Sequence, residues 1–561
     1  MNTSYRNTLF FVIVISMVMM IPFLGLTDFN TKGEPREAVV AYTMLENGNW
    51  ILPVNNGGDI PYKPPFFHWC IALCSLLPGY VSEFTSRLPS ALALVFMTIG
   101  GFVFYAKRKN PEVALLAALL TLTSFEVHRA GYACRVDMML AALVVGALYL
   151  LYRWYERGMH NMPWLAILCM SAAMLTKGPV GIILPCLVTG VFMLVEKEKF
   201  WSTFGRFVVI ALLAMIIPLM WYYAAYQQGG DEFLALVKEE NIDRFLGKMS
   251  YESHVEPFYY NFITLIAGWL PWTVALVISL FVLPWKRFSK SAFMESVRKA
   301  DKLQVFSWLA FLIVLFFYCI PKSKRSVYIL PCYPFMAFLL AEYVVWLAKN
   351  KLAVLKSYAG FIAVVCVLLT VAFVVVRCGA VPDSMFHGRH AAQNLAMLHN
   401  LESLGINPYT LLMLLLPLAA GGFAIWILLR KAPARQLVVA MFASVMALYL
   451  AYDGVYQPAV LNAKADKYLA PAIAEKFDLT KLYSYNAIDM LHFFSMNFYL
   501  GDKIQTFDRK LPKEGVVMVS SGDRQKFFDL YGKQYGFRQV WAVDHLVESR
   551  DSVYFYDFRT K

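Results

Sequence analysis

The feature that most restricts the fold is a series of long apolar stretches separated by short polar segments. A helix of about 20 apolar residues is long enough to cross the hydrocarbon core of a bilayer. By length and hydropathy we expect about thirteen such helices. Their approximate ranges are 9–26, 86–106, 112–127, 138–152, 163–176, 179–195, 206–226, 259–285, 303–320, 327–348, 355–377, 408–429 and 436–457. The first stretch is long for a signal peptide and no small-x-small cleavage site follows it, so we expect it to be retained.

Composition supports a polytopic membrane protein. Of the 561 residues, 59% are hydrophobic and 16% are charged, and the mean hydropathy is +0.53, which is far too apolar for a soluble protein of this size. A net charge of +13 would suggest nucleic acid in a soluble protein, but in a membrane protein such an excess gathers in cytoplasmic loops. We therefore expect no nucleic-acid partner. The nine cysteines lack zinc-type spacing and most lie in apolar stretches, where they are typical packing residues.

The distribution of basic residues predicts the orientation. With a cytoplasmic N-terminus, the basic clusters at 107–109, 286–302, 349–356 and 430–435 all fall on the cytoplasmic side, as the positive-inside rule requires. An odd number of spans then places the C-terminal segment on the outer face.

With this orientation the stretch PKSKRSVYILPCYP puts Lys322, Lys324 and Arg325 outside, where the same rule disfavours them. Other expected outer segments carry cations too, namely Lys32, Arg36, Lys63, His128, Arg129, Arg135, Lys177, Arg244 and Lys248. Each alone could bind a lipid headgroup or cap a helix C-terminus. Their recurrence favours a shared anionic ligand, and a lipid phosphate fits because Lys and Arg supply charge-assisted hydrogen bonds to it.

Carboxylates accompany these cations. The first outer loop, residues 27–85, carries Asp28, Glu34 and Glu37, and residues 35–46 within it are typical of a short amphipathic interfacial helix that ends at Asn47-Gly48. Asp137 lies at the mouth of a span, where a charge needs a partner or a task; a helix N-cap is the alternative. Acids and cations together suit group transfer from a lipid phosphate, because a carboxylate can remove the acceptor proton while cations stabilise the departing phosphate.

Several short motifs carry a resemblance to a known family. They are GEPRE, ML.NG.WI.P and YKPP..HW in the first loop, the Asp137 loop, LTKGP at 175–179, ENIDRF with H..PFYY at 240–260, and K.K...YILPC at 322–332. In this order and spacing the chain resembles the polyprenyl-phosphate-dependent glycosyltransferases of the GT-C fold, which include the bacterial lipid A aminoarabinose transferase and the protein O-mannosyltransferases. The resemblance covers roughly the first 350 residues.

The resemblance implies roles for individual residues. The residues that would bind the donor phosphate are Lys63, Arg244, Lys322, Lys324 and Tyr328. Glu34 and Asp137 match acidic positions, either of which could act as the base or position the acceptor, and Arg36 would pair with one of them. The motifs also contain Glu240, His254 and Lys177; His254 could instead begin a helix, and Lys177 could equally form a buried structural pair.

Two departures from the family pattern limit what the resemblance implies. The family's adjacent acidic pair is Gly33-Glu34 here, so Glu37, which replaces an aromatic residue, or Asp28 could substitute for the missing acid. Tyr62 replaces the Glu before Lys-Pro. Metal dependence is therefore undecided, and we do not expect the sugar to be aminoarabinose. No P-loop or GxGxxG motif is present, so we expect no nucleotide cofactor.

Beyond the last span the pattern changes. The helical segment AKADKYLAPAIAEKF precedes strands at KLYSYN, KIQTFD, GVVMVSS, FRQVWAV and DSVYFYDF. We therefore expect an all-α polytopic GT-C domain at 1–457 and a small α/β periplasmic domain at 458–561. The predicted function is transfer of a sugar from an undecaprenyl-phosphate donor, in the bacterial inner membrane, to lipid A, another envelope lipid or glycan, or a protein hydroxyl. A transporter of lipid-linked sugars is the rival, but it would carry ionisable residues in mid-span and matching broken helices in two repeats.

Overall fold

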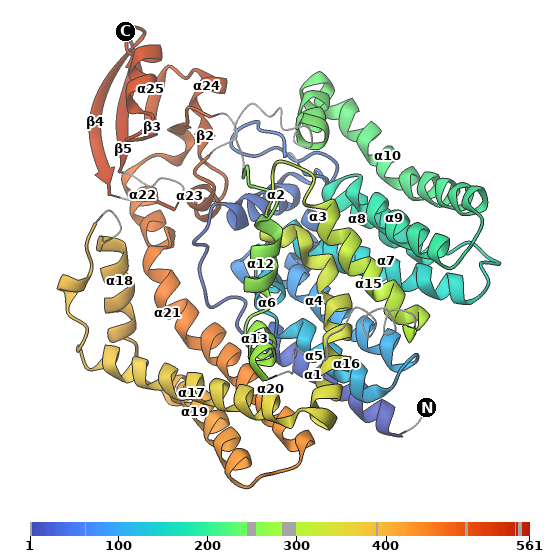
Figure 1. Cartoon of the computed structure of the whole chain (residues 1–561). Coiled ribbons are helices and arrows are strands. Elements are labelled where there is room, and N and C mark those ends of the chain that lie inside the picture. Colours follow the sequence, from blue (N-terminus) through green and yellow to red (C-terminus); the bar gives the residue numbers. More distant parts are fainter. Residues whose placement is uncertain are drawn as a thin grey trace. The chain divides into compact units, whose positions relative to one another are not determined.

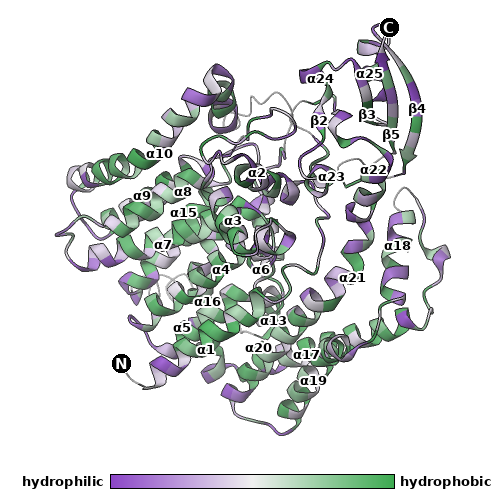
Figure 2. Ribbon diagram, turned by 180° about the vertical axis from the view of Figure 1, so that it is seen from behind, coloured by the Kyte–Doolittle hydropathy of each residue, from purple (hydrophilic) through white to green (hydrophobic). Residues whose placement is uncertain are grey.

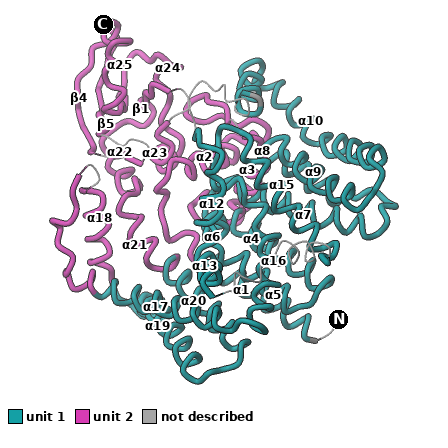
Figure 3. Tube along the Cα trace, in the orientation of Figure 1, with its two compact units in different colours: residues 1–22, 90–374, 406–452 teal, residues 23–89, 375–405, 453–561 magenta. Residues whose placement is uncertain are grey.

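The computed structural model describes residues 3–61, 63–243, 254–282, 299–388, 391–488, 492–544, 546–547 and 552–561. The chain forms two compact units (Figure 3). Unit 1 comprises Met1–Pro22, Ser90–Val374 and Ile406–Tyr452, and unit 2 comprises Phe23–Pro89, Val375–Gly405 and Asp453–Lys561. Most of the predicted first outer loop therefore groups with the C-terminal segment. The predicted domain division at 457/458 stays a prediction.

Unit 1 is helical (Figure 1), and helices such as α7, α8, α9 and α15 are largely hydrophobic along their length (Figure 2). Its helices are α1 (Thr3–Met20), α5 (Pro111–Leu122), α6 (Phe125–Gly131), α7 (Val136–Glu156), α8 (Trp164–Lys177), α9 (Val180–Val195), α10 (Phe200–Lys238), α12 (Tyr260–Gly268), α13 (Trp272–Val282), α15 (Lys302–Phe317), α16 (Tyr333–Asn350), α19 (Pro408–Leu429) and α20 (Ala434–Ala451). Two helices cross a unit boundary, α4 (Glu83–Ala106) and α17 (Leu352–Arg377).

Local sequence explains several helix starts. Asn110 caps α5 by accepting a hydrogen bond from the Val113 amide at 2.9 Å, and Pro111 occupies the first helical position, where its missing N–H costs nothing. Asp301 and Gln304 form a reciprocal capping box at the start of α15. Asn407 caps α19 in the same way as Asn110 caps α5.

Among the described residues, seven helices are long and apolar enough to cross a membrane, or up to nine if two bent pairs each count as one span. The seven are Glu83–Ala106, Val136–Glu156, Phe200–Asn241, Ser326–Asn350, Leu352–Arg377, Pro408–Leu429 and Ala434–Lys464. Five shorter apolar helices accompany them, Ser4–Met20, Phe66–Leu76, Trp164–Lys177, Val180–Val195 and Lys302–Phe317. The chain is thus a mostly helical, multi-pass membrane protein, as predicted, and the count of thirteen spans stays a prediction.

Two stretches that we predicted as single spans are bent. The stretch 112–127 turns by 67° between α5 and α6, and the stretch 259–285 turns by 98° between α12 and α13. Pro271 stands at the second bend, where a residue without a backbone N–H cannot continue the helix before it. Hydrophobicity alone does not reveal such bends, because both arms remain apolar.

Unit 2 contains the α/β part. Its helices are α2 (Gly33–Asn47), α3 (Phe66–Leu76), α18 (Ala391–Glu402), α21 (Gln457–Leu461), α22 (Ala470–Lys476), α23 (Phe494–Tyr499), α24 (Phe507–Lys510) and α25 (Arg524–Tyr531). The strands are β1 (Leu482–Tyr485), β2 (Gln505–Thr506), β3 (Glu514–Ser520), β4 (Tyr535–Val543) and β5 (Val553–Thr560), in the order β2-β1-β3-β5-β4. All five predicted strands are confirmed. β1 runs parallel to β2 and β3, whereas β5 is antiparallel to β3 and β4.

The sheet is covered on both faces. Leu482, Met518 and Phe555 belong to one apolar cluster, and the neighbouring residues Tyr483 and Val517 belong to another. Successive side chains on a strand point to opposite faces, so each strand contributes to both clusters. The predicted helix of the first loop is α2, which ends at Gly48 with φ 66° as its sequence predicts. Most residues of α2 are buried, and it packs on α3 and α23 within unit 2.

Candidate active site

In unit 1 the predicted residues Asp137, Lys177 and Tyr328 come together. Lys177 is the last residue of α8 and Asp137 lies in the first turn of α7, and their side chains form an ion pair in which they are 15% and 7% exposed. The Lys177 ammonium also lies 3.9 Å from the centre of the Tyr328 ring, within the range of a cation–π contact. Asp137 is therefore not the N-cap, a position that Arg135 holds. It is a buried carboxylate with a cationic partner.

Further positive charge surrounds Asp137. Arg325 and Arg135 both interact favourably with its carboxylate. Arg325 ends the basic part of the PKSKRS segment, directly before the 3-10 helix η3 (Ser326–Cys332) that carries Tyr328. The group of residues Arg135, Asp137, Lys177, Arg325 and Tyr328 is called the Asp137 cluster below.

The basic segment itself pairs with the chain around His254. The Lys324 amide donates to the His254 carbonyl at 2.9 Å, and the Glu256 amide donates to the Lys322 carbonyl at 3.2 Å. Between these two hydrogen bonds, Val255 and Ser323 form an isolated antiparallel β-bridge. Lys324 is buried and its ammonium donates to the Glu256 carbonyl at 2.8 Å, whereas Lys322 is exposed. His254 does not begin a helix, because α12 starts only at Tyr260.

In unit 2 the structure assigns Glu34 a partner that the sequence did not suggest. Arg87 donates from Nε to Oε1 of Glu34 at 2.8 Å and from Nη2 to Oε2 at 3.1 Å, and both residues are buried. Arg87 Nη1 also donates to the Leu24 and Thr27 carbonyls. A bidentate guanidinium–carboxylate pair is strong and fixed in geometry. The only available sequence signal was an arginine inside the predicted span 86–106.

A second buried pair involves Glu37. Its Oε1 accepts from Nη2 of Arg36 at 3.1 Å, and its Oε2 lies 2.8 Å from Nε2 of His68. Arg36 thus forms an ion pair with Glu37, and its predicted pairing with Glu34 or Asp137 stays a prediction. His68 is the histidine of the YKPP..HW motif, to which the sequence analysis assigned no role.

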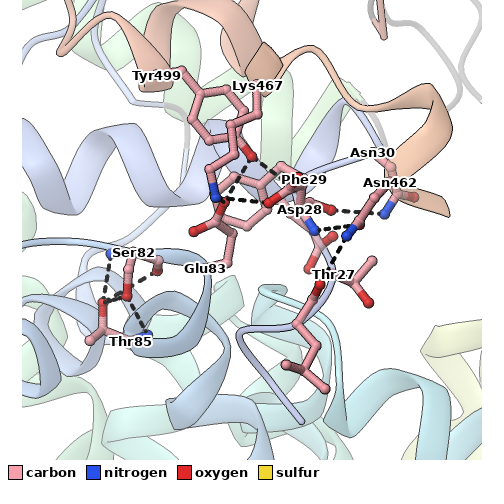
Figure 4. A network of polar contacts seen from close by, with 12 residues as sticks. Thr27, Asp28, Phe29, Asn30, Ser82, Glu83, Thr85, Asn462, Lys467 and Tyr499 are labelled. Carbon is pink, nitrogen blue, oxygen red and sulfur yellow. Dashed lines mark hydrogen bonds and ion pairs between the residues drawn. The ribbon is translucent and has the colours of Figure 1, made fainter. Parts of the chain in front are cut away.

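Asp28 belongs to a polar network around Lys467 in the same unit (Figure 4). The Lys467 ammonium donates to Oδ1 of Asp28 and to Oε1 of Glu83, both at 2.8 Å, and the Tyr499 hydroxyl donates to Glu83 at 3.0 Å. The backbone amide of Asp28 donates to Asn462 at 2.9 Å. Burial lowers the pKa of Lys467, but the hydrogen bonds to Asp28 and Glu83 outweigh it, so the pKa is raised. Asp28 therefore links the first loop to the C-terminal segment of the same unit through Lys467 and Asn462.

The structure gives less information on the remaining predicted residues. Tyr62 and Arg244 lie outside the described residues. Lys63 is half-buried just before α3, and Glu240 is buried in the π-helical turn η1 (Glu239–Asp243) of unit 1. Over the described ranges, no group of three His, Cys, Asp or Glu side chains is placed to hold a metal ion.

Comparison with known proteins bears on this arrangement. The family model described as dolichyl-phosphate-mannose-protein mannosyltransferase matches residues 62–222. The crystal structure of ArnT from Cupriavidus metallidurans bound to undecaprenyl phosphate superposes with a TM-score of 0.71 at 18% identity, and the match covers 99% of this chain and 98% of that one. The chain has the GT-C glycosyltransferase fold.

Curated relatives agree with this fold. An undecaprenyl phosphate-alpha-4-amino-4-deoxy-L-arabinose arabinosyl transferase of Shewanella sediminis is 28% identical over 365 residues, which are 63% of this chain and 62% of the relative. The same-named protein of Pectobacterium carotovorum is 27% identical over 58% of this chain and 57% of its own length. The matched part thus spans about three-fifths of these relatives. These matches agree with the resemblance stated from the sequence: the relatives are named as glycosyltransferases, and this chain shares the fold of one of them.

Proposed function

We propose that the chain is a membrane glycosyltransferase that moves a sugar from a polyprenyl-phosphate donor to an acceptor on the outer face of a bacterial inner membrane. The observation that carries this proposal is the Asp137 cluster, in which a buried carboxylate stands among three cations at the mouths of apolar helices. A charge in such a place needs a function or a partner, and the family match and the named relatives direct the choice to sugar transfer.

Asp137 is the better base of the two acids that the resemblance singles out. Both carboxylate oxygens of Glu34 accept hydrogen bonds from Arg87, so Glu34 serves to hold α2. Lys177 donates to Oδ1 of Asp137 only, so this side chain leaves Oδ2 available to a substrate hydroxyl. We assign Asp137 as the group that receives the acceptor proton.

In the proposed reaction the acceptor oxygen attacks C1 of the sugar with inversion. The bond from C1 to the donor phosphate oxygen breaks, polyprenyl phosphate departs with the electron pair, and the acceptor proton passes to Asp137. Lys322, Lys324 and Tyr328 would bind the phosphate, and the resemblance adds Lys63 and Arg244 to them. Cations at this position act because negative charge grows on the phosphate oxygen in the transition state.

The donor lipid of a bacterial enzyme of this class would be undecaprenyl phosphate, and the acceptor would be lipid A or another envelope lipid or glycan. A protein hydroxyl is the alternative acceptor, because the matched family model is named for protein mannosyl transfer. The relatives' names specify aminoarabinose, but Gly33 and Tyr62 depart from the family pattern at two acidic positions, and we propose a different sugar. The N-terminus would be cytoplasmic and the C-terminal domain periplasmic.

A transfer assay tests the proposal. The purified full-length protein is mixed with radiolabelled undecaprenyl-phosphate sugars and an envelope extract, and Asp137→Asn is compared with Asp231→Asn, an exposed acid of α10. Label should move to an acceptor with the wild type and with Asp231→Asn, and Asp137→Asn should lose at least about 100-fold in rate. If no donor is consumed while labelled lipid crosses the bilayer of proteoliposomes, the chain is a transporter and the proposal fails.

A further inference from the structure

A cavity of about 630 Å³ lies within unit 1, between helices α1, α5, α16 and α20. This volume falls within the range of small-ligand sites, about 300 to 1,000 Å³. None of the residues to which a donor-phosphate role is assigned above lines it. The cavity is therefore separate from the Asp137 cluster and has no role in the proposed transfer.

The lining of the cavity is divided between a polar and an apolar part. Ser4 and Glu112 lie in the first turns of α1 and α5, Arg435 lies in the first turn of α20, and Lys349 lies in the last turn of α16. The apolar side chains, such as Phe442, lie farther along these helices. Because three helices begin where the fourth ends, the charged residues share one end of the cavity. The positive-inside rule assigns this end to the cytoplasm.

The charged end has an excess of positive charge. Within the described part of the chain, neither Lys349 nor Arg435 forms an ion pair, whereas nearby Lys109 is neutralised by Asp301 and Glu342 at 2.5 and 2.9 Å. The N-cap of α20, Pro433, forms no side-chain cap hydrogen bond, so the first amides of this 18-residue helix add to the attraction for an anion.

The geometry points to a binding site for one anionic phospholipid of the cytoplasmic leaflet: we propose that its phosphate binds Arg435 and Lys349 and that an acyl chain fills the apolar part of the cavity. Basic residues at a membrane interface attract anionic headgroups. The apolar part is lined by Phe11, Leu119 and Phe442, among others, and a chain of methylene groups that fills it gains van der Waals contact with these side chains.

A second cavity of the same unit provides an internal comparison. It has a volume of about 430 Å³ between α9 and α10, and its lining consists of apolar residues with Thr203 and no charged side chain. If the acyl chain of a phospholipid entered this cavity, no charged side chain of the lining would be available to bind the phosphate of its headgroup. Binding there should not distinguish an anionic from a zwitterionic headgroup.

The headgroup part of the proposal is tested by native mass spectrometry of the purified full-length protein. The protein is titrated with phosphatidylglycerol or phosphatidylcholine of identical acyl chains. Phosphatidylglycerol should bind about 30-fold more tightly, since each basic residue near a membrane surface contributes about fivefold. The double variant Lys349→Ala/Arg435→Ala should lose this preference. The control Lys107→Ala/Lys356→Ala, which changes two exposed basic residues outside the cavity lining, should keep it.

The acyl-chain part is tested by filling each cavity. Ala443→Trp narrows the charged cavity and Ala211→Trp narrows the uncharged one, and both alanines are half-buried lining residues. Ala443→Trp should remove the tightly bound phosphatidylglycerol while Ala211→Trp retains it, with thermal unfolding used to confirm that both variants are folded. Equal binding of the two lipids by the wild type would overturn the proposal. The proposal would also be overturned if the control double variant lost the preference for phosphatidylglycerol, or if Lys349→Ala/Arg435→Ala kept it.

Discussion

Nε2 of His68 lies 2.8 Å from Oε2 of Glu37, and both side chains are almost completely buried, at 2% and 4% exposure. Glu37 lies on α2, so a buried polar pair joins this helix to α3, which carries His68. The second oxygen of the same carboxylate accepts from Arg36. The Glu37 carboxylate thus contacts both His68 and Arg36.

Replacing His68 should show how much its hydrogen bond with Glu37 contributes to the stability of the protein. We expect His68→Ala to destabilise the protein by about 1–3 kcal/mol, because a buried acceptor loses its hydrogen bond. His68→Gln, which retains an amide donor, should lose less. Thermal unfolding in detergent measures both. Equal losses for the two variants would mean that ring packing, and not the hydrogen bond, stabilises this site.

The ion pair of Asp137 and Lys177 should show strong coupling in a double-mutant cycle. Asp137→Asn and Lys177→Met each leave one charge in a buried place, at a cost of about 3–5 kcal/mol. The double variant removes both charges, so its loss should be smaller than the sum of the single losses. Unfolding temperatures of the four proteins provide the measurement. If the loss of stability in the double variant equalled the sum of the two single losses, this would contradict the ion pair seen in the structure.

Reversal of charge at Lys467 should loosen the first loop. Lys467→Glu places a third carboxylate beside Asp28 and Glu83, and we expect faster amide exchange of residues 27–30, whose Asp28 and Phe29 amides donate to Asn462 and Tyr499. Lys481→Glu serves as the control because its pair with Glu514 is exposed, and such pairs contribute little. Hydrogen exchange read by mass spectrometry compares the two variants. Equal rates of amide exchange at residues 27–30 in the two variants would show that Lys467 does not hold the first loop in place.

The stability of unit 2 should fall as pH rises toward neutrality because of Asp502. The pKa of its carboxyl is raised from 3.8 to about 6. Burial is the main cause and the nearby Asp59 carboxylate adds to it, and together they outweigh the hydrogen bonds from Asn56 and Asn497 and the charge of Lys503, which lower the pKa. The folded state thus binds the proton more tightly than the unfolded state. The stability gained from this proton is lost between about pH 4 and pH 6, and integrates to about 3 kcal/mol.

Asp502→Asn should remove this dependence and raise the unfolding temperature above pH 6. Asparagine can still accept from the Asn56 amide, and it tolerates the φ of 56° at this position. His492 also faces Asp59, at 2.9 Å, and this contact is left unchanged in the variant. Thermal unfolding of wild type and variant from pH 4 to pH 8 provides the comparison. Parallel curves for the two proteins would exclude Asp502 as the source.

Local patterns in the sequence determined much of this protein. Alternation of apolar residues located all five strands, Gly48 marked the end of α2, and long apolar stretches located the helices of unit 1. These features depend on residues within a few positions of one another, because strand and helix periodicity and helix caps are local. The motif spacing likewise drew attention to Asp137 and Lys177, which the structure joins in an ion pair.

Only the tertiary structure decided how the charges pair and where the apolar stretches bend. Glu34 and Arg87 are 53 positions apart, and Glu37 and His68 are 31 apart, so no local pattern joins them. A buried charge takes the partner that packing brings within hydrogen-bond distance, since leaving it alone costs more than any local preference provides. The bends between α5 and α6 and between α12 and α13 are likewise features of the structure that the hydropathy pattern does not contain. A hydropathy profile records how apolar a segment is and contains no information about its direction.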